Sequence, residues 1–372
     1  MHTPSPPGLK PTLPRTPRRG SRGFSLIEIM VGLVIGLIAV LVIQRAFATF
    51  EAQKRSTSTG AEAQQNALVS LYTVTRDVRQ AGYGIPLDLL NCPTNIYNSV
   101  TNSANSFPLV PATITANANG THSITIIYST ASTVSGSTKI VAAMPISSNV
   151  FKVANPFVYV PGNLVMVHEP GKSCAILQVS NISPTNCQGS ACNLLTSSTP
   201  QFPYNPPGGD NKLIFPPEGY STGATITNLG TFANVTYSID AASNRLNHTD
   251  NNTGIVSEIA DNIADLRAQY GYDLNNNNII EPAEYLEPVG LPVPPDWDRV
   301  LSVRIAAMAR SNLAERLDAT AAFTCTTTLI APSTPWLAAF TMRNDPSGTP
   351  WQCYRYRIYE TIVPLRNIIW TK

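Results

Sequence analysis

The strongest pattern in the chain is an apolar run close to its N-terminus. Residues 29–43 are apolar except for two glycines, and the run is led by Phe24, Ser25, Leu26, Ile27 and Glu28. A helix of about 20 residues spans about 30 Å, the thickness of the hydrocarbon core of a bilayer. Residues 24–43 are therefore predicted to form one membrane-spanning helix.

Helical spacing continues beyond this run. No proline occurs between residue 45 and Pro86, and apolar side chains recur every three or four positions. We predict a single helix over residues 24–81, which Gly82, Gly84 and Pro86 end, and whose second half packs its apolar stripe against a sheet. The positions of that stripe are Leu68, Leu71, Tyr72, Thr75, Val78 and Ala81.

The remainder of the chain is rich in Ser, Thr, Asn and Pro and has short alternating runs. Such runs are typical of antiparallel strands joined by long loops. The predicted fold class is α+β, with a β-rich variable region over 82–230 and a more compact β-rich core over 231–372. The predicted strands are 123–128, 157–160, 175–179, 233–240, 300–310 and 354–365. The helical spacing of Val256, Ile259, Ile263 and Leu266 predicts a short helix before a strand near Tyr270.

Residues 1–23 form a basic, proline-rich stretch that is predicted to be extended and to stay in the cytoplasm. Its cations are Lys10, Arg15, Arg18, Arg19 and Arg22, and it contains no acid. Without this stretch the formal net charge falls from +2 to a small negative value. Because a nucleic-acid surface needs clustered Lys and Arg, this distribution counts against a nucleic-acid partner.

Other N-terminal signals fit the same region less well. A secretory signal peptide also begins basic and turns apolar, and Ala46 and Ala48 resemble a cleavage site. The apolar run is long for such a peptide, and Glu28 lies inside its start, where a carboxylate is costly. Arg18-Arg19 lacks the apolar pair that would follow in a twin-arginine signal. An ordinary membrane anchor explains the length but not the glutamate.

A basic leader, Gly23, Phe24 and a glutamate at Glu28 together resemble the signal of type IV pilins and type II secretion pseudopilins. The resemblance implies that a prepilin peptidase cuts between Gly23 and Phe24 and methylates the new amine. It also implies that Glu28 meets the amino terminus of a neighbouring subunit during assembly. The alternative is that Glu28 only reaches the lipid headgroups. Gly32 and Gly36 have the spacing that lets membrane helices approach closely.

Part of the second half resembles minor pilins of the PilW type, which are related to the J-class pseudopilins. The matching runs are 236–240 (TYSID), 263–266 (IADL), 270–273 (YGYD), 296–300 (DWDRV) and 363–367 (VPLRN). The resemblance covers the first 80 residues or so and the last 140 or so of the chain. It implies a non-enzymatic minor pilin in the inner membrane that primes the filament and sits at its tip. Its partners would be other minor pilins, the major pilin, the prepilin peptidase, the assembly platform and a tip adhesin.

Two further functions stay open within this architecture. One is a minor pseudopilin of a type II secretion filament, although the large middle region favours a pilus. The other is a tip adhesin or DNA-uptake pilin with its ligand contacts in residues 85–230. A positively charged surface patch would support DNA uptake, and its absence would count against it.

The cysteines form an even set that lies after the apolar run, as expected for a domain in an oxidising compartment. They are Cys92, Cys174, Cys187, Cys192, Cys325 and Cys353. Their spacing lacks CxxC and does not fit zinc. The simplest pairing joins Cys187 to Cys192 and joins the others as 92 with 174 and 325 with 353, which is one of about 15 connectivities.

Residues 273–284 place oxygen-bearing side chains at the ligand positions of an EF-hand calcium loop. Asn278 stands where the loop usually has glycine, which is tolerable because Asn adopts a positive φ more readily than most residues. With few carboxylates, we expect weak Ca²⁺ affinity. The alternative is an Asn-rich turn. The candidate ligands are Asp273, Asn275, Asn277, Ile279 (through its carbonyl), Glu281 and Glu284.

Two other motifs have simpler interpretations. Residues 219–223 spell GxSxG around Ser221, and Asp240 and His248 follow in the order of α/β-hydrolases. Prolines precede the motif and no helix is predicted after it, so catalysis is not expected. Aromatic side chains also gather near the C-terminus, where core packing is a better explanation than a partner surface. They are Trp336, Trp351, Tyr354 and Tyr356.

Overall fold

The computed structural model describes most of the chain and divides it into two compact units. These are Met1–Arg55 and Ser56–Lys372. The described residues are 23–85, 89, 92–99, 102–130, 136–183, 192–231, 233–292, 295–314, 325, 340 and 342–369.

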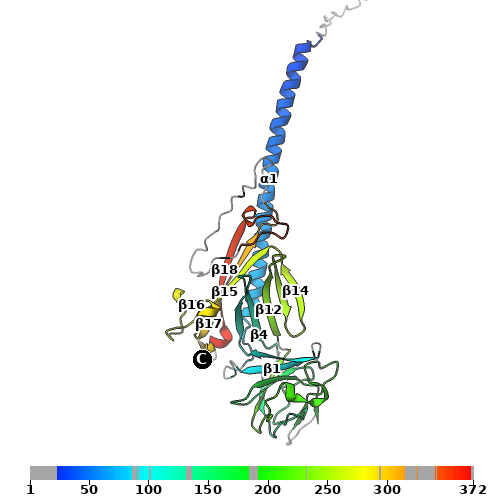
Figure 1. Ribbon diagram of the computed structural model, residues 1–372, viewed down its shortest axis with the longest axis vertical. Helices are drawn as coiled ribbons and strands as arrows, with labels where there is room; N and C mark the ends of the chain where they lie inside the picture. The colour runs from blue at the N-terminus through cyan, green and yellow to red at the C-terminus, as the bar shows by residue number, and fades with distance from the viewer. Residues whose placement is uncertain are drawn as a thin grey trace, which may run out of the picture. The chain divides into compact units, whose positions relative to one another are not determined.

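A single long helix, α1 (Leu26–Val78), runs through both units (Figure 1). It begins two residues later and ends three residues earlier than the predicted helix. Turns follow over residues 79–84, where Gly82 and Gly84 take φ values of +75° and +72°. These values favour glycine because a Cβ atom is strained there. The amide of Gly82 donates to the carbonyl of Ile127 (2.9 Å), so the chain passes directly from the helix to a strand of the globular unit.

Four of the six positions of the predicted stripe are buried, namely Leu71, Thr75, Val78 and Ala81. Leu68 and Tyr72 are 50% and 70% exposed, so their predicted burial is wrong. Small side chains lie on the buried face instead and let the helix backbone approach the sheets closely. Helical periodicity alone did not separate these two faces, because both carry apolar residues. The buried apolar positions are Ala63, Ala67, Leu71, Val74 and Val78.

Two antiparallel sheets pack with this face of α1 into one hydrophobic core. The five-stranded sheet has the order β14-β13-β12-β4-β3, and the four-stranded sheet has the order β16-β15-β17-β18. The strands of the first are β3 (Ala112–Ala116), β4 (His122–Tyr128), β12 (Ala233–Asp240), β13 (Arg245–Asp250) and β14 (Ile255–Ala260). The strands of the second are β15 (Ile263–Tyr272), β16 (Tyr285–Leu286), β17 (Val300–Arg310) and β18 (Tyr356–Pro364).

The helix predicted from Val256 to Leu266 is wrong, because this segment forms β14 and β15. All ten residues of β15 are buried. One face of the strand packs into the core with α1, and side chains of other residues cover the opposite face. A strand buried on both faces loses the alternation that identifies strands in a sequence. The predicted strands over 123–128, 233–240, 300–310 and 354–365 correspond to β4, β12, β17 and β18.

The other two sheets form a separate part of the globular unit, residues 85–108 and 136–230, which we call the lobe. Its six-stranded sheet has the order β2-β1-β8-β7-β11-β5, and its three-stranded sheet has the order β6-β10-β9. The strands of the first are β1 (Pro93–Asn98), β2 (Ser103–Pro108), β5 (Ser137–Lys139), β7 (Leu164–His168), β8 (Cys174–Gln178) and β11 (Thr225–Gly230). Those of the second are β6 (Val150–Val153), β9 (Asn181–Ser183) and β10 (Cys192–Leu195).

Short helices connect the strands. The C-terminal α2 (Arg366–Ile369) is α-helical. The 3₁₀ helices are Pro207–Gly209, Asn211–Leu213, Pro282–Glu284, Pro288–Gly290, Trp297–Arg299 and Trp351–Cys353.

The predicted strand over 175–179 corresponds to β8, whereas residues 157–160 form a turn. Here Phe157 is 79% exposed and its amide donates to the side chain of Asn155 (3.0 Å). The lobe has a hydrophobic core of its own, between its two sheets. One sheet crosses residue 231, because β4 from the preceding region pairs with β12, and β3 pairs with β4.

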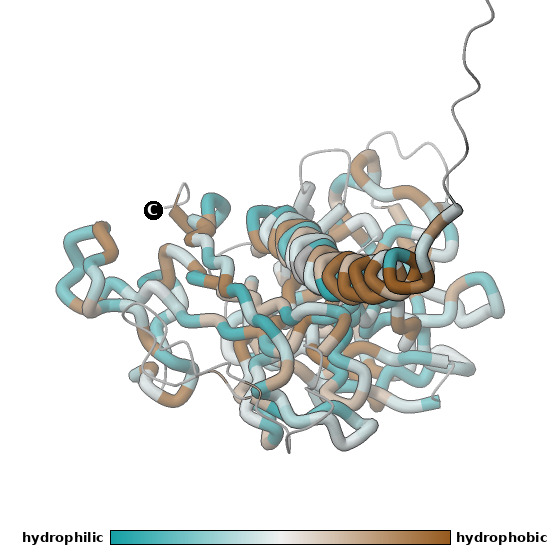
Figure 2. The backbone as a smooth tube through the Cα atoms, turned by 90° about the horizontal axis from the view of Figure 1, so that it is seen from above, coloured by the Kyte–Doolittle hydropathy of each residue, from teal (hydrophilic) through white to brown (hydrophobic). Residues whose placement is uncertain are grey.

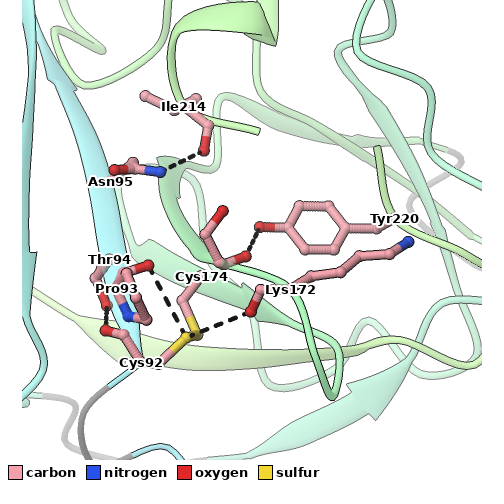
Figure 3. The surroundings of a disulfide bond; sticks show 9 residues. Cys92, Pro93, Thr94, Asn95, Lys172, Cys174, Ile214 and Tyr220 are labelled. Atoms are coloured by element: carbon pink, nitrogen blue, oxygen red, sulfur yellow. Dashed lines mark hydrogen bonds between the residues drawn. A yellow bond between two sulfur atoms is a disulfide. The ribbon is translucent and has the colours of Figure 1, made fainter. Parts of the chain in front are cut away.

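A disulfide ties the beginning of the lobe to its centre. Cys92 and Cys174 are bonded, and Figure 3 shows them where β1 runs parallel to β8. Nearby, Asn95 donates to the carbonyl of Ile214 (3.2 Å). A second disulfide joins Cys325 to Cys353, so both of these predicted pairings occur. Cys192 is disulfide-bonded too. Cys187 lies outside the described residues, and its pairing stays a prediction.

The two sheets beside α1 are joined through a buried histidine. Nδ1 of His122 on β4 lies 3.0 Å from the carbonyl oxygen of Ala268 on β15 and 3.1 Å from its amide nitrogen. Nε2 faces Glu287 Oε2 at 3.5 Å. Burial, aided by the charge of Arg267, lowers the pKa of His122 below its usual value, although Glu287 opposes this shift. The folded protein therefore favours the neutral ring.

We predict that the globular unit loses stability on mild acidification. Because the folded-state pKa of His122 is lowered, its stabilising contribution is complete above about pH 6.5 and is lost as the pH falls below that value. The slope cannot exceed about 1.4 kcal/mol per pH unit for one proton. Urea unfolding between pH 7.5 and 5.5 should show this slope, and His122→Gln should flatten it. The matched variant His248→Gln should keep it; an equal slope in all three proteins would contradict the prediction.

Candidate assembly segment and surfaces of the globular unit

The predicted cleavage site lies just ahead of α1. Residues 23–25 are exposed and non-helical, and the carbonyl of Ser25 accepts hydrogen bonds from the amides of Glu28 (3.0 Å) and Ile29 (3.2 Å). The first helical turn therefore forms after the bond between Gly23 and Phe24. A peptidase needs a segment it can bind in extended form, and this stretch has no backbone structure to melt first.

Glu28 lies in the first turn of α1 and is exposed. Its carboxylate forms no hydrogen bond or ion pair with any residue that the structure describes. A carboxylate near the N-terminus of a helix is favoured by the helix dipole. It is also correctly charged to meet a newly formed amino terminus, which is the role that the sequence predicted for it.

The first part of α1 has the character of a membrane span. The most apolar 18-residue window within Leu26–Glu51 has a mean hydropathy of 3.0, and none of that window is buried. Within the described residues this is the one helix that is long and apolar enough to cross a membrane. The hydropathy colouring in Figure 2 is brown over the start of α1 and mixed farther along the helix. Exposed apolar surface of this extent requires lipid or other helices to cover it.

The predicted calcium ligands lie in one loop between β15 and the 3₁₀ helix at 282–284. Asp273 accepts from the amides of Asn277 (3.1 Å) and Asn278 (2.8 Å), and Glu284 accepts from those of Leu274 and Glu281 (2.9 Å each). The amide of Asn277 also donates to Asn275, and the amide of Ile279 donates to the side chain of Asn277. The side chains thus stabilise the backbone of the loop. Among the described residues no three His, Cys, Asp or Glu side chains are grouped to hold a metal.

The GxSxG serine does not have the surroundings of a hydrolase nucleophile. Ser221 Oγ accepts from Lys172 Nζ (3.2 Å), and the same ammonium donates to Glu169 (2.9 Å). Asp240 instead accepts from Ser243, while the ring of His248 packs edge-on against Tyr237. The structure therefore does not unite Ser221, Asp240 and His248, and Ser221 precedes a strand rather than a helix.

The aromatic group near the C-terminus is largely core. Tyr354 and Tyr356 are buried in a small hydrophobic cluster on the outer face of β17, and Trp351 packs against it. Arg310 stacks over the ring of Tyr354 at 4.4 Å and pairs with Asp345 (2.8 Å). Trp336 lies outside the described residues.

Comparison with known protein families matched two parts of the chain, the N-terminal segment and the strands beside α1. Residues 234–367 match the family model described as Type IV Pilus-assembly protein W, and residues 18–43 match the Prokaryotic N-terminal methylation motif. Two regions of the chain are therefore similar to type IV pilus proteins, one of them to the PilW family. The first match contains β12 to β18, and the second contains Gly23, Phe24 and Glu28. Neither match covers residues 44–233.

Other comparisons add little to this assignment. Among solved structures, a type IV-like pilin from Thermus thermophilus is 12% identical and covers 56% of this chain and 87% of its own, with a TM-score of 0.21. A TM-score this low does not establish a common fold. No curated protein matches the chain.

The pilin motif implies association with other pilins and with a prepilin peptidase. It also fits a pilin that is anchored in a membrane by its N-terminal helix. The sequence signal for this segment was strong because lipid contact demands an unbroken apolar run. Sequence reasoning missed the pocket at the start of β17, whose lining residues are scattered along the chain between residues 278 and 369.

Calcium binding by the loop remains a prediction, and calorimetric titration of the full chain in detergent tests it. Calcium would have to displace backbone donors from Asp273 or Glu284, so we expect a dissociation constant of about 10⁻⁴–10⁻³ M. Asp273→Asn should abolish the heat of binding, whereas the matched surface variant Asp240→Asn should retain it. No heat at millimolar calcium would contradict the prediction.

Proposed function

We propose that this chain is a minor pilin of a type IV pilus that primes filament assembly at the inner membrane and stays at the filament tip. In this proposal a prepilin peptidase removes residues 1–23, and residues 24–43 hold the protein in the inner membrane. The globular unit lies in the periplasm, where it joins other minor pilins before the major pilin is added. The protein is a structural component and not an enzyme.

The position of the lobe is the observation that carries the proposed tip location. Within the globular unit, α1 enters at Ser56 and ends at Val78, and the lobe follows at that C-terminal end (Figure 1). Just after the helix, Ile85 and Leu89 are buried in a cluster with Met166 of β7. Within the globular unit, the lobe therefore lies at the end where α1 stops, away from Ser56.

A lobe in that position limits where the subunit can sit. Filaments arise from repeated contacts that leave one end of each subunit against the next subunit. When new subunits enter from the membrane, the space beyond the C-terminal end of each helix is filled by the subunit added before it. An extra lobe with its own core would collide with that earlier subunit. A subunit with nothing ahead of it, the first one added, avoids this collision.

The charge of the lobe bears on the alternative functions, which are DNA uptake, adhesion and type II secretion. Residues 85–230 contain four lysines, no arginine and four acids. Two of the lysines, Lys172 and Lys212, are paired with Glu169 and Asp210. Nucleic-acid binding depends on clustered cations, so this composition counts against a DNA-uptake pilin. It leaves adhesion to an uncharged ligand and a role in a type II secretion filament as alternatives, and the size of the lobe favours the pilus.

Gold-labelled antibody against the globular unit tests the tip location on isolated filaments. We expect label at one end of each filament, and label spread along the filament length would contradict the proposal. Glu28→Ala is the matched variant, because it removes the carboxylate proposed to meet a neighbouring amine while leaving Gly23 and Phe24 unchanged. We expect this variant to be cut normally and to be absent from filaments.

A further inference from the structure

A pocket of about 530 Å³ opens at one end of the four-stranded sheet, where β17 begins and β18 ends. A pocket of this size accommodates a small ligand or one or two large side chains. Its lining residues are Asn278, Ile280, Leu301, Ser302, Pro364 and Ile369. Four of the six are apolar and none is charged, so a charged ligand would find no counter-ion among them.

The floor of the pocket contains a buried hydroxyl group without a partner. Ser302 is 5% exposed, and its Oγ atom forms no hydrogen bond with any described residue. The hydroxyl lies over Gly271 on the neighbouring strand, where a Cβ atom would come within 2.1 Å of it. This oxygen atom is fully buried, so the hydroxyl shapes the floor of the pocket without offering a donor to a ligand.

The rim of the pocket offers a second polar group. Asn278 is exposed, and within the described part of the chain its side-chain amide has no hydrogen-bond partner, because only its backbone amide is engaged. The backbone of Asn278 has a φ of +61°, which fixes the direction in which the side chain leaves the loop. The pocket thus combines apolar walls with one amide at the rim. This combination suits an apolar side chain attached to a peptide group.

The strand beside the pocket can bind a peptide backbone. β18 pairs with β17 on one side, and no strand among the described residues pairs with its other edge. Such an edge presents unpaired backbone donors and acceptors, to which an extended segment of another chain can add. Because Pro364 ends β18 and also lines the pocket, a segment added along β18 reaches the pocket at its end.

We propose that the pocket binds a large apolar side chain from an extended segment of a different pilin subunit. The inference rests on the proposed function, which supplies other pilins as the partners. Backbone hydrogen bonds along β18 would give affinity, and the pocket would select the side chain. The contact would lie on the part of the chain that matches the PilW family, away from the lobe, so one subunit could hold a neighbour while the lobe stays exposed.

Site-specific photo-crosslinking in cells that assemble filaments tests this proposal. A photoreactive phenylalanine derivative in place of Ile369, which is 38% exposed, reports on the pocket. The same group in place of Ile255, which is 62% exposed on β14, is the control. We expect the pocket position to crosslink to a peptide of a different chain that carries a prepilin-type N-terminus, as identified by mass spectrometry.

Asn278→Gly separates binding from folding. Glycine adopts the φ of +61° at this position without strain, and the side-chain amide that is lost has no described partner, so the free energy of unfolding should change little. Loss of the hydrogen bond between this amide and the bound segment should reduce the crosslink at position 369 about five-fold and leave that at position 255 unchanged. An unchanged yield at position 369 would overturn the proposal.

The molecule that crosslinks to position 369 decides between the proposal and its alternatives. Crosslinks at position 369 only to lipid, to a small molecule, to a second copy of this chain or to its own residues 370–372 would each overturn the proposal. Cleavage at Phe24 and label at filament ends are measured in the same cells. If both persist while the pocket crosslink fails, the proposed function stands and only the pocket assignment falls.

Discussion

Close packing of the second half of α1 against two sheets is the constraint on which the globular unit depends. Ala63 and Ala67 let the backbone of the helix approach the sheets, and β4, β12 and β17 contribute side chains to the same core. At the end of the helix, buried Asp77 accepts a hydrogen bond from the hydroxyl of Tyr237 on β12 (2.7 Å). Burial beside Asp77 raises the pKa of Tyr237, so the hydroxyl stays a donor. The arrangement fixes where the chain leaves the helix and hence where the lobe begins.

The parts of the molecule around this helix have different roles. The apolar first part of α1 is suited to lipid and to neighbouring helices, while Glu28 and the cleavage segment lie at its start. The PilW-matched strands form most of the core beside the helix and carry the pocket at Ser302. The lobe, held by the disulfide between Cys92 and Cys174, adds a second core that the family match does not cover. A protein built in this way can contact other subunits through one part and present another part freely.

Sequence patterns predicted those helices and strands whose sequence is governed by one physical requirement. Lipid contact requires an unbroken apolar run, so the start of α1 was clear, and β17 alternates strongly enough to be found within its limits of Val300–Arg310. Most of the predicted stripe on α1 is buried, but Leu68 and Tyr72 were wrongly included because they are as apolar as the residues that pack. β15 was partly mistaken for helix because both of its faces are buried. The pocket could not be predicted, since it requires Gly271 and Ser302 to be neighbours in space.

The most direct test of this account is the intact mass of the protein from native membranes, with fragmentation of its N-terminus. The account predicts a chain that begins at Phe24 with an N-methylated amine. That result would link Gly23, Phe24 and Glu28 to processing and to entry into a filament. A chain that begins after Ala48 would instead identify an ordinary exported protein. Glu28 would then be removed with the signal, and the central claim would be contradicted.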